Sequence, residues 1–348
     1  MACSKNVTAV MASVLALMGS VEAALADDAL HVAWFGGSWG EGFRACVAEP
    51  FTKATGIAVV PEVGTSTVTL SKLQQQKDAP TIDVAWMDGG VSELAGDAGV
   101  VDNLDPEAIP NLKSVLPQAI YKKGDVNYAV GTGYFSVGLT YNTQEIKTPP
   151  ISWNDLWKPE FADLVTIPSP SNSSGVPFIV FLSNIWGFST SDLAPTFAKL
   201  KELKAALYFD SSGAATNAFQ NKEAIIGAHF SIAAWDMIDK GQPIAFVTPK
   251  EGVWANDSRL HLVKNTARKA QAQKFIDIAL TPSVAACLAE KAYLGPSLKD
   301  VTVPAPVARK LPWGEHGSVA NLRLFDWNEV NARRAAIVDT WNREIARK

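Results

Sequence analysis

The stretch from Leu30 to Val59 constrains the fold of this chain more than any other segment. It opens with an apolar run, Leu30–Phe35, that predicts a buried strand, and continues through a glycine-rich turn, an amphipathic helix and a second strand. The turn, Gly36-Gly37-Ser38-Trp39-Gly40, fits two kinds of site. It suits either a catalytic serine elbow of the form G-x-S-x-G or a backbone cradle for a small ligand.

The residues before this stretch predict an export signal. Lys5 supplies a positive charge, Val7–Met18 an apolar run, and Ala24-Leu25-Ala26 a small-residue cleavage motif. This pattern predicts a signal peptide over residues 1–26, because the apolar run is too short to span a membrane. An uncleaved anchor or a disordered tail is the alternative. We expect the mature chain in a bacterial periplasm, exported by its cleaved signal peptide.

Charge and cysteine content exclude several classes of protein. The net charge is −4 and charges of both signs are dispersed, which excludes a basic stripe for nucleic acid and a polybasic membrane patch. The chain has neither a CxxC pair nor a Cys/His cluster, so we expect no metal and no cofactor. Cys46 and Cys287 remain after the predicted cleavage. They form either a disulfide, which an oxidising compartment permits, or two separate buried thiols.

Beyond the opening stretch, predicted strands alternate with predicted helices. The strands are Ala58–Val63, Thr81–Met87, Tyr128–Val130, Tyr134–Tyr141, Leu164–Ile167, Ala206–Phe209, Ala224–Ala228 and Arg259–Val263. The helices are Thr65–Gln76, Val91–Ala98, Ser174–Trp186, Ala214–Gln220, Ala233–Lys240, Ala267–Leu280, Val284–Ala292 and Asp326–Arg347. This succession predicts an α/β fold, with a mostly parallel sheet between helices. The length of 348 residues favours two lobes over one core.

Ligands of open α/β sheets bind outside the carboxyl ends of the strands, and that rule selects a definite set of loops. These loops are Gly36–Trp39, Gly64–Thr67, Trp86–Gly90, Ser169–Gly175, Asp210–Thr216, His229–Ser231 and Glu251–Asp257. Most of them lead into a predicted helix, whose free N–H groups suit a carboxylate, a phosphate or a polar oxygen. Turn and capping chemistry explains any one loop alone, but the set together indicates a binding site.

The serine elbow is poorly supported by its position in the chain. An elbow needs an oxyanion hole built partly from the loop of an earlier strand, and Ser38 follows the first predicted strand. Asp210 or Asp236, followed by His261 or His316, would supply the remaining triad members in the right order. We keep a secreted serine hydrolase as the alternative, and we expect no enzyme.

The order of several motifs resembles the solute-binding proteins of ABC importers. The motifs are FGGSWGE, EPFTKATGIAV, TIDVAWMDGG, SWNDLWKPEFADLV, the loop Pro249–Trp254 and the paired helices of Ala270–Gly295. They resemble most the polyamine (spermidine/putrescine) group, which is related to the iron(III)- and thiamine-binding proteins. The similarity spans nearly the whole mature chain.

This resemblance implies a type II-like, two-lobed periplasmic binding protein. Each lobe is a mixed sheet flanked by helices, and crossing hinge strands join the two. The implied bounds are 27–135 plus 258–300 for the first lobe, and 136–257 plus 301–348 for the second. A small solute would be captured between the lobes by hinge closure, and an inner-membrane permease would be the partner. We expect a monomer.

Some functional residues of the resembled group are matched in this chain, and others are replaced. Its first-lobe contacts match Ser38 and Trp39, and its loop after the third strand matches Met87 and Asp88. The tryptophan that flanks a polyamine chain looks like Trp254, but Asn256 replaces the carboxylate two residues on. A second family tryptophan falls at His229 or Phe230, and paired acids of the second lobe are replaced by Ser171-Asn172-Ser173-Ser174.

These replacements remove carboxylates that would neutralise ammonium groups, and an unpaired buried ammonium is costly. The solute expected is therefore a small polar organic compound, polyamine-like or bearing amine and carboxylate groups, with an anionic organic solute as an alternative. The expected binding residues are Gly37, Ser38, Trp39, Thr65, Ser66, Met87, Asp88, Ser173, Ser174, Ser212, Gly213, His229, Phe230, Trp254 and Asn256.

Overall fold

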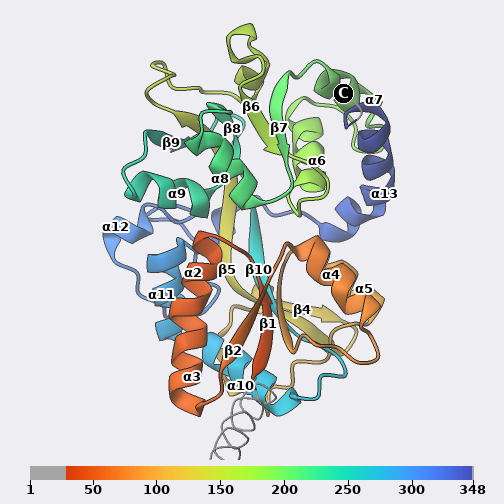
Figure 1. Cartoon of the computed structure of the whole chain (residues 1–348), viewed down its shortest axis with the longest axis vertical. Coiled ribbons are helices and arrows are strands. Elements are labelled where there is room, and N and C mark those ends of the chain that lie inside the picture. The colour runs from red at the N-terminus through yellow and green to blue at the C-terminus, as the bar shows by residue number, and fades with distance from the viewer. Residues whose placement is uncertain (1–28, 347–348) are drawn as a thin grey trace, which may run out of the picture.

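One ten-stranded sheet connects the whole molecule (Figure 1). In the computed structural model, which describes residues 29–346, the strand order is β2-β1-β3-β10-β5-β8-β6-β7, and β4 and β9 each pair with β5. The strands are β1 (Leu30–Trp34), β2 (Val59–Val63), β3 (Val84–Asp88), β4 (Ile120–Lys123), β5 (Val126–Asn142), β6 (Val165–Pro168), β7 (Ala205–Phe209), β8 (Ile226–Phe230), β9 (Ile244–Val247) and β10 (Trp254–Leu262).

Helices cover the sheet in both halves of the molecule (Figure 1). The α-helices are α2 (Ser38–Phe43), α3 (Glu49–Thr55), α4 (Ser66–Gln75), α5 (Val91–Ala98), α6 (Gly175–Ile185), α7 (Ala194–Lys201), α8 (Ser212–Gln220), α9 (Ser231–Asp239), α10 (Lys269–Ala279), α11 (Pro282–Ala292), α12 (Ala305–Ala308) and α13 (Trp327–Glu344). A π-helical segment, η1 (Arg44–Ala48), joins α2 to α3, and short 3-10 segments are η2 (Pro110–Ser114), η3 (Pro117–Ala119), η4 (Trp153–Trp157), η5 (Pro159–Phe161) and η6 (Val319–Asn321).

The first lobe, built on β1 to β4, is a three-layered structure whose core follows the alternation of its strands. Trp86 packs with Phe43 and Phe275 on the face covered by η1, α2 and α10. Met87, the next residue, packs instead with Leu70 and the other side chains of α4 and α5. Successive side chains of a strand point to opposite faces, so the apolar run at residues 84–87 of β3 requires a helix layer on each side.

Two long antiparallel strands, β5 and β10, run from the first lobe into the second (Figure 1). The start of β5 pairs with β4, while its last part pairs with β8 and β9 of the second lobe. Its glycines permit close packing along the way: a Cβ on Gly133 would lie 2.7 Å from the Cβ of Leu294. These strands are the crossing connections that the sequence predicts.

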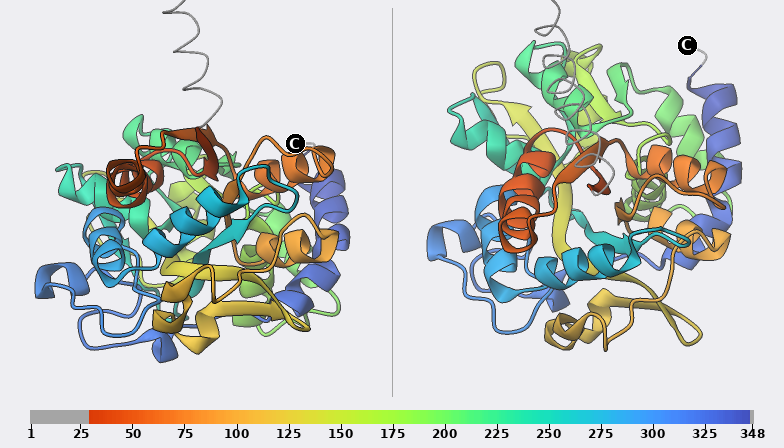
Figure 2. Two further views of the ribbon diagram at one scale, coloured as in Figure 1. Left: turned by 90° about the horizontal axis from the view of Figure 1, so that it is seen from below. Right: turned by 60° about the horizontal axis from the view of Figure 1, so that its bottom comes forward.

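The last helix, α13, also links the lobes. Figure 2 shows it along one side of the molecule, where it packs on α6 and α7 of the second lobe while its first part reaches α5 of the first. Asn331, near its start, donates a 2.7 Å hydrogen bond from Nδ2 to the carbonyl of Gly90. The chain therefore contacts the β3–α5 turn with its C-terminal helix.

Most of the predicted elements are present within one to three residues of their predicted bounds, and α5 has the predicted ones. Three expectations are wrong. The sheet is mixed rather than mostly parallel, because β5 and β10 pair antiparallel with all their neighbours. The two predicted segments Tyr128–Val130 and Tyr134–Tyr141 form one strand, β5. The predicted loop Glu251–Asp257 becomes strand from Trp254 onward, because Trp254 to Asp257 pair with β5 in an antiparallel ladder.

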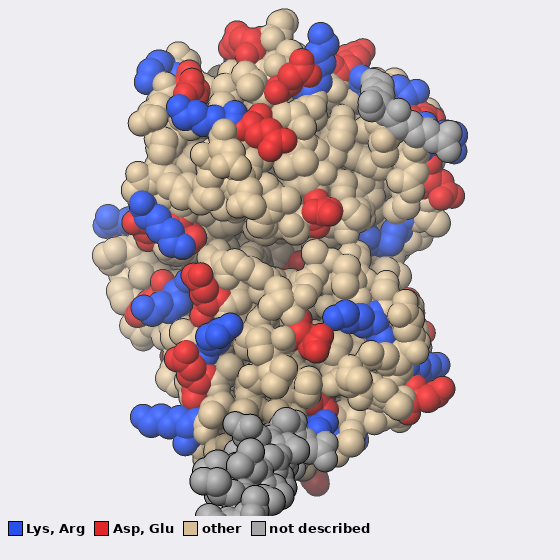
Figure 3. All heavy atoms as spheres, viewed as in Figure 1, with Lys and Arg blue, Asp and Glu red and all other residues tan. Residues whose placement is uncertain are grey.

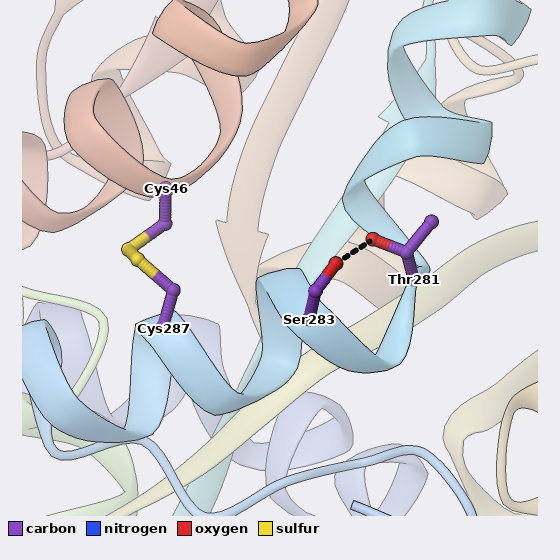
Figure 4. Close-up of a disulfide and its surroundings, with 4 residues drawn as sticks. All are labelled: Cys46, Thr281, Ser283 and Cys287. Carbon is purple, nitrogen blue, oxygen red and sulfur yellow. Dashed lines mark hydrogen bonds between the residues drawn. A yellow bond between two sulfur atoms is a disulfide. The ribbon is translucent and has the colours of Figure 1, made fainter.

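A disulfide joins Cys46 in η1 to Cys287 in α11, with an S–S distance of 2.00 Å across a sequence separation of 241 (Figure 4). This resolves the alternatives left open by the sequence and excludes two separate thiols. The bond ties the start of the first lobe to its last helix.

The predicted signal peptide, residues 1–26, lies outside the described residues. Within residues 29–346, no helix combines the length and the apolar character that a membrane crossing requires.

Candidate ligand-binding cleft

A cleft of about 450 Å³ lies between the two lobes. The space-filling view of Figure 3 shows the surface hollowed at mid-height, between the two halves, with mostly uncharged atoms around it. Many of the predicted binding residues line this cleft: Gly37, Trp39, Thr65, Ser66, Asp88, Ser173, Ser212, Gly213 and Phe230. They come from the carboxyl ends of strands and the first turns of helices in both lobes, as the general rule for α/β sheets predicts.

The other predicted residues lie close to the cleft but do not line it. Met87 and His229 each precede a lining residue in a strand and therefore point to the opposite face of the sheet. His229 is fully buried, its Nε2 lies 3.0 Å from the hydroxyl of Thr216, and burial lowers its pKa to about 3. Ser38 and Ser174 are next to lining residues at the starts of α2 and α6, and do not line the cleft themselves.

Trp254 and Asn256 belong to strand β10 and support the cleft from behind. The ring of Trp254 is fully buried, with its centroid 5.5 Å from that of Phe325. Asn256 donates a 3.1 Å hydrogen bond from Nδ2 to the carbonyl of Gly89. It therefore fixes the turn that follows Asp88.

The first-lobe wall begins at the glycine-rich turn after β1. Gly37 has a φ of 64°, in the left-handed region, so this position favours glycine and lets the chain enter α2 abruptly. Trp39 then packs edge-on against Phe135 and Phe230, with centroid distances of 4.9 and 6.1 Å. Trp39 and Phe230 line the cleft with apolar surface from both lobes, and the fully buried Phe135 packs against both rings.

Asp88, the last residue of β3, is the charged residue among those that line the cleft within residues 29–346. Its Oδ2 accepts a 2.7 Å hydrogen bond from the hydroxyl of Ser173, in the second lobe. Its Oδ1 is buried and has no hydrogen-bond partner among the described residues. Burial, reinforced by the negative charge of Asp257, raises the pKa of Asp88 to about 7 against the opposing effects of Ser173, Arg259 and Ser66.

A buried charge cluster lies beneath Asp88. The guanidinium of Arg259 contacts the carboxylates of Asp257, at 2.9 Å, and Glu93, at 2.5 Å. The same group lies 3.4 Å from the ring centroid of Tyr121, whose hydroxyl donates to Asp257 at 2.7 Å. Since Arg259 already serves two carboxylates, it leaves the charge of Asp88 largely uncompensated.

The second-lobe wall contains the N-terminus of α8. Ser211 is the N-cap, and its hydroxyl accepts a hydrogen bond from the N–H of Ala214 at 3.2 Å. The N–H of Ala215 bonds to the carbonyl of Ser211, so the first-turn N–H groups that remain are those of Ser212 and Gly213. Both residues line the cleft.

Among the described residues, hydrogen bonds cross the cleft at two points and join the lobes. One is the bond from Ser173 to Asp88, and the other runs from the hydroxyl of Thr67 to the carbonyl of Ser171, at 2.8 Å. Ser171 and Ser173 of the second lobe therefore both contact the first lobe.

Some lining residues were not among those predicted. Phe35, Val63 and Val68 add apolar surface to the first-lobe wall. Phe35 and Val63 lie at the carboxyl ends of β1 and β2, a position that could have identified them. Among the described residues, no group of His, Cys, Asp and Glu side chains is arranged to hold a metal ion.

Comparisons with known proteins agree with this geometry. A profile of the family described as bacterial extracellular solute-binding protein matches residues 79–331. The chain is 28% identical over 289 residues to the spermidine/putrescine-binding periplasmic protein of Salmonella typhimurium, covering 80% of each chain. It is 23% identical over 319 residues to a protein of Salmonella paratyphi A named for binding 2-aminoethylphosphonate, covering 85% of each. A solved ABC transporter structure from Clostridium perfringens matches with a TM-score of 0.68 at 25% identity, over 91% of this chain and 99% of that one.

The fold and the cleft define a two-lobed solute-binding protein. The chain belongs to the family of bacterial extracellular solute-binding proteins. The predicted resemblance, the fold class and the predicted function as the solute-binding component of an ABC importer are therefore confirmed.

Proposed function

We propose that the protein binds a small polar organic solute in the cleft described above and delivers it from the periplasm to the inner-membrane permease of an ABC importer. The observation that carries this proposal is the position of the cleft. It lies between lobes that are joined by β5 and β10, and residues of both lobes line it. A solute held there touches both lobes at once.

Closure of the lobes follows from this arrangement. A solute that contacts both walls stabilises the closed form by the difference between its affinities for the closed and open forms. The long strands β5 and β10 are the hinge, because they alone continue from one part of the sheet into the other. We place the lobe bounds at 27–135 plus 258–300 and at 136–257 plus 301–348.

The class of solute is narrower than the names of the relatives suggest. The relatives are named for spermidine and putrescine or for 2-aminoethylphosphonate, and all of these compounds carry an amine. Asp88 offers a carboxylate for an amine, whereas Ser173 and Asn172 stand where the resemblance described above places the acids of the polyamine group. This supports a solute with an amine and a polar or anionic group.

We infer that the protein is no enzyme. Ser38 starts α2, and two of the histidines are committed elsewhere: His229 contacts Thr216, and His261 contacts Ser92 and the carbonyl of Ala85. Neither is hydrogen-bonded to Ser38, so neither is placed as its base. We also propose that the mature protein acts as a monomer without nucleic acid, after removal of residues 1–26.

A thermal-shift screen tests the proposed function. Polyamines, amino acids, opines, phosphonates and small carboxylates would be added to the mature protein, and hits would be confirmed by calorimetry and small-angle scattering. A solute at one hundred times its Kd adds about 2.7 kcal/mol to the free energy of unfolding. The radius of gyration of the protein should also decrease when the solute binds.

A variant with a filled cleft would show whether a solute found in the screen binds there. A Cβ on Gly213 meets open space, so Gly213→Trp should place a ring in the cleft and abolish binding. Asn217→Trp adds the same ring to the exposed side of α8 and serves as the control. Undiminished binding to Gly213→Trp would exclude the cleft, and ester hydrolysis that requires Ser38 would overturn the proposal.

A further inference from the structure

The charged side chains around the cleft can pair with one cation. Asp88 is the charged residue of the lining within the described chain, and its Oδ1 is buried without a partner. An ammonium group placed there would donate a charge-assisted hydrogen bond to Oδ1, which would then no longer be buried without a partner. Asp210, which precedes the N-cap of α8, is exposed and does not line the cleft.

A second cation would find no such partner. Asp257 and Glu93 are both bound to Arg259, behind the cleft, and Glu251 accepts hydrogen bonds from Ser152 and from the N–H of Trp153. Burying an unpaired ammonium costs several kcal/mol, enough to reject a compound with an extra one. The cleft is therefore suited to a solute with a single ammonium group.

The opposite wall offers donors rather than acceptors. The N–H groups of Ser212 and Gly213 are the free donors of the nine-residue helix α8, whose first turn holds no acidic residue. The N-terminus of a helix carries partial positive charge and favours anions. Asp88 lies in the first lobe and α8 in the second, so opposite charges of one solute can be met from opposite lobes.

We propose that the solute is a short zwitterion, whose ammonium group lies against Asp88 and whose carboxylate or phosphonate lies against the N-terminus of α8. This inference rests on the proposed function and narrows its solute to one chemical class. Phe35, Trp39 and Phe230 enclose the methylene groups between the two charges. The dipolar solute then joins the lobes at both of its ends.

A matched series of compounds tests the inference. The zwitterions 3-aminopropanoate, 4-aminobutanoate and 2-aminoethylphosphonate would be compared by calorimetry with 1,3-diaminopropane, 1,4-diaminobutane and butanedioate. The best zwitterion should bind at least about tenfold more tightly than any diamine or diacid, since each loses one charge-assisted contact. A diamine or a diacid that binds as tightly as the best zwitterion would overturn the inference.

Two substitutions locate the charged ends of the solute. Asp88→Asn should weaken zwitterion binding by about tenfold or more, whereas Asp78→Asn, at an exposed acid of the same lobe, should leave it unchanged. Ser212→Pro removes one N–H at the first helical position, where proline is tolerated, and Ser212→Ala keeps that N–H. The proline variant alone should weaken zwitterion binding. Circular dichroism would check that each variant folds.

Equal affinity of Ser212→Pro and Ser212→Ala for the zwitterion would show that its anionic group does not lie against the N-terminus of α8. That result would overturn this half of the inference. A screening hit without an ammonium group that Gly213→Trp abolishes would overturn the whole inference and leave the proposed function intact. If no compound of the screen binds, the proposed function fails together with the inference.

Discussion

The hydroxyl of Ser173 donates a 2.7 Å hydrogen bond to Oδ2 of Asp88 across the cleft. Ser173 belongs to the second lobe and Asp88 to the first, and both are more than nine-tenths buried. The same carboxylate therefore links the lobes through one oxygen, while its other oxygen is buried without a hydrogen-bond partner among the described residues. If the solute binds at Asp88 as we propose, lobe closure and solute binding share this side chain.

Removing this bond should favour the open form. Ser173→Ala deletes the donor, and with it about 1 kcal/mol or more of closed-state stabilisation. We expect a larger radius of gyration by small-angle scattering in the absence of solute. Ser283→Ala removes a similar hydroxyl contact, to Thr281 in α11 (Figure 4), and should not change the radius. An identical radius for wild type and Ser173→Ala would show that this bond does not hold the lobes closed.

Asp88 should lower the stability of the protein at alkaline pH. Its pKa rises from 3.8 to about 7 on folding, so the folded state binds more protons than the unfolded state between these values. Stability from this group is present below pH 4 and is lost as the pH rises through 7. Asp88→Asn should therefore raise the free energy of unfolding at pH 8 by about 1–3 kcal/mol and leave it nearly unchanged at pH 4.

Urea unfolding of both proteins across this pH range would measure the difference. The groups that face Asp88 are Asp257 and Arg259 from β10, Ser66 from α4 and Ser173 before α6. A difference that does not vary with pH would contradict the assignment to Asp88. For an ammonium-bearing solute the sign is opposite, because the ionised carboxylate binds it and affinity should increase up to about pH 7.

The disulfide should stabilise the protein without shaping its site. It closes a loop across 241 positions, and bonds of this kind contribute about 2–5 kcal/mol. The double substitution Cys46→Ala/Cys287→Ala should lower the denaturation midpoint by a matching amount and keep solute affinity within about threefold. Dithiothreitol should reproduce the shift in the wild type and have no effect on the variant.

His261 should make stability sensitive to acid. It is buried, its Nδ1 donates to the carbonyl of Ala85 and its Nε2 accepts from Ser92, and burial lowers its pKa to about 3. The unfolded state alone takes up this proton below pH 6.5, so the stabilisation is lost as the pH falls. His261→Asn should be less stable than wild type at pH 8, with a gap that narrows by about 1.4 kcal/mol per pH unit below pH 6. A constant gap would contradict the assignment.

Trp254 should matter for stability more than for affinity. Its ring is buried against Phe325 and does not line the cleft. Trp254→Ala should cost about 3–5 kcal/mol in unfolding experiments. The milder Trp254→Phe, measured by calorimetry at low temperature, should change the solute Kd by less than about threefold. A much larger loss of affinity in Trp254→Phe would indicate that Trp254 contacts the solute.

The sequence predicts the succession of strands and helices well, because β1 and β3 are mostly apolar and are followed by glycine turns, and α5 has a clear start and end. It does not predict that Trp254 is in a strand, since only the pairing with Val137 of β5 makes it one. Residues that are nonlocal partners, such as Cys46 and Cys287, are likewise invisible to local patterns.

For the site, strand ends locate the cleft, and side-chain direction decides which residues line it. Asp88 and Phe230 end their strands and reach the cleft, whereas Met87 and His229, one residue earlier, point away. The contact between Ser173 and Asp88 depends on how the lobes meet. No pattern within either segment contains that information.

The bond between Cys46 and Cys287 also sets an order of assembly. In the proposed export, Cys46 emerges early, and Cys287 follows only after residues 136–257 of the second lobe have been translocated. Strand β10, which pairs with β3, emerges late as well. The first lobe therefore begins the chain but stays incomplete until β10 and α11 have emerged, and the second lobe still waits for α13 after that. Cys46 stays unpaired until Cys287 has followed it.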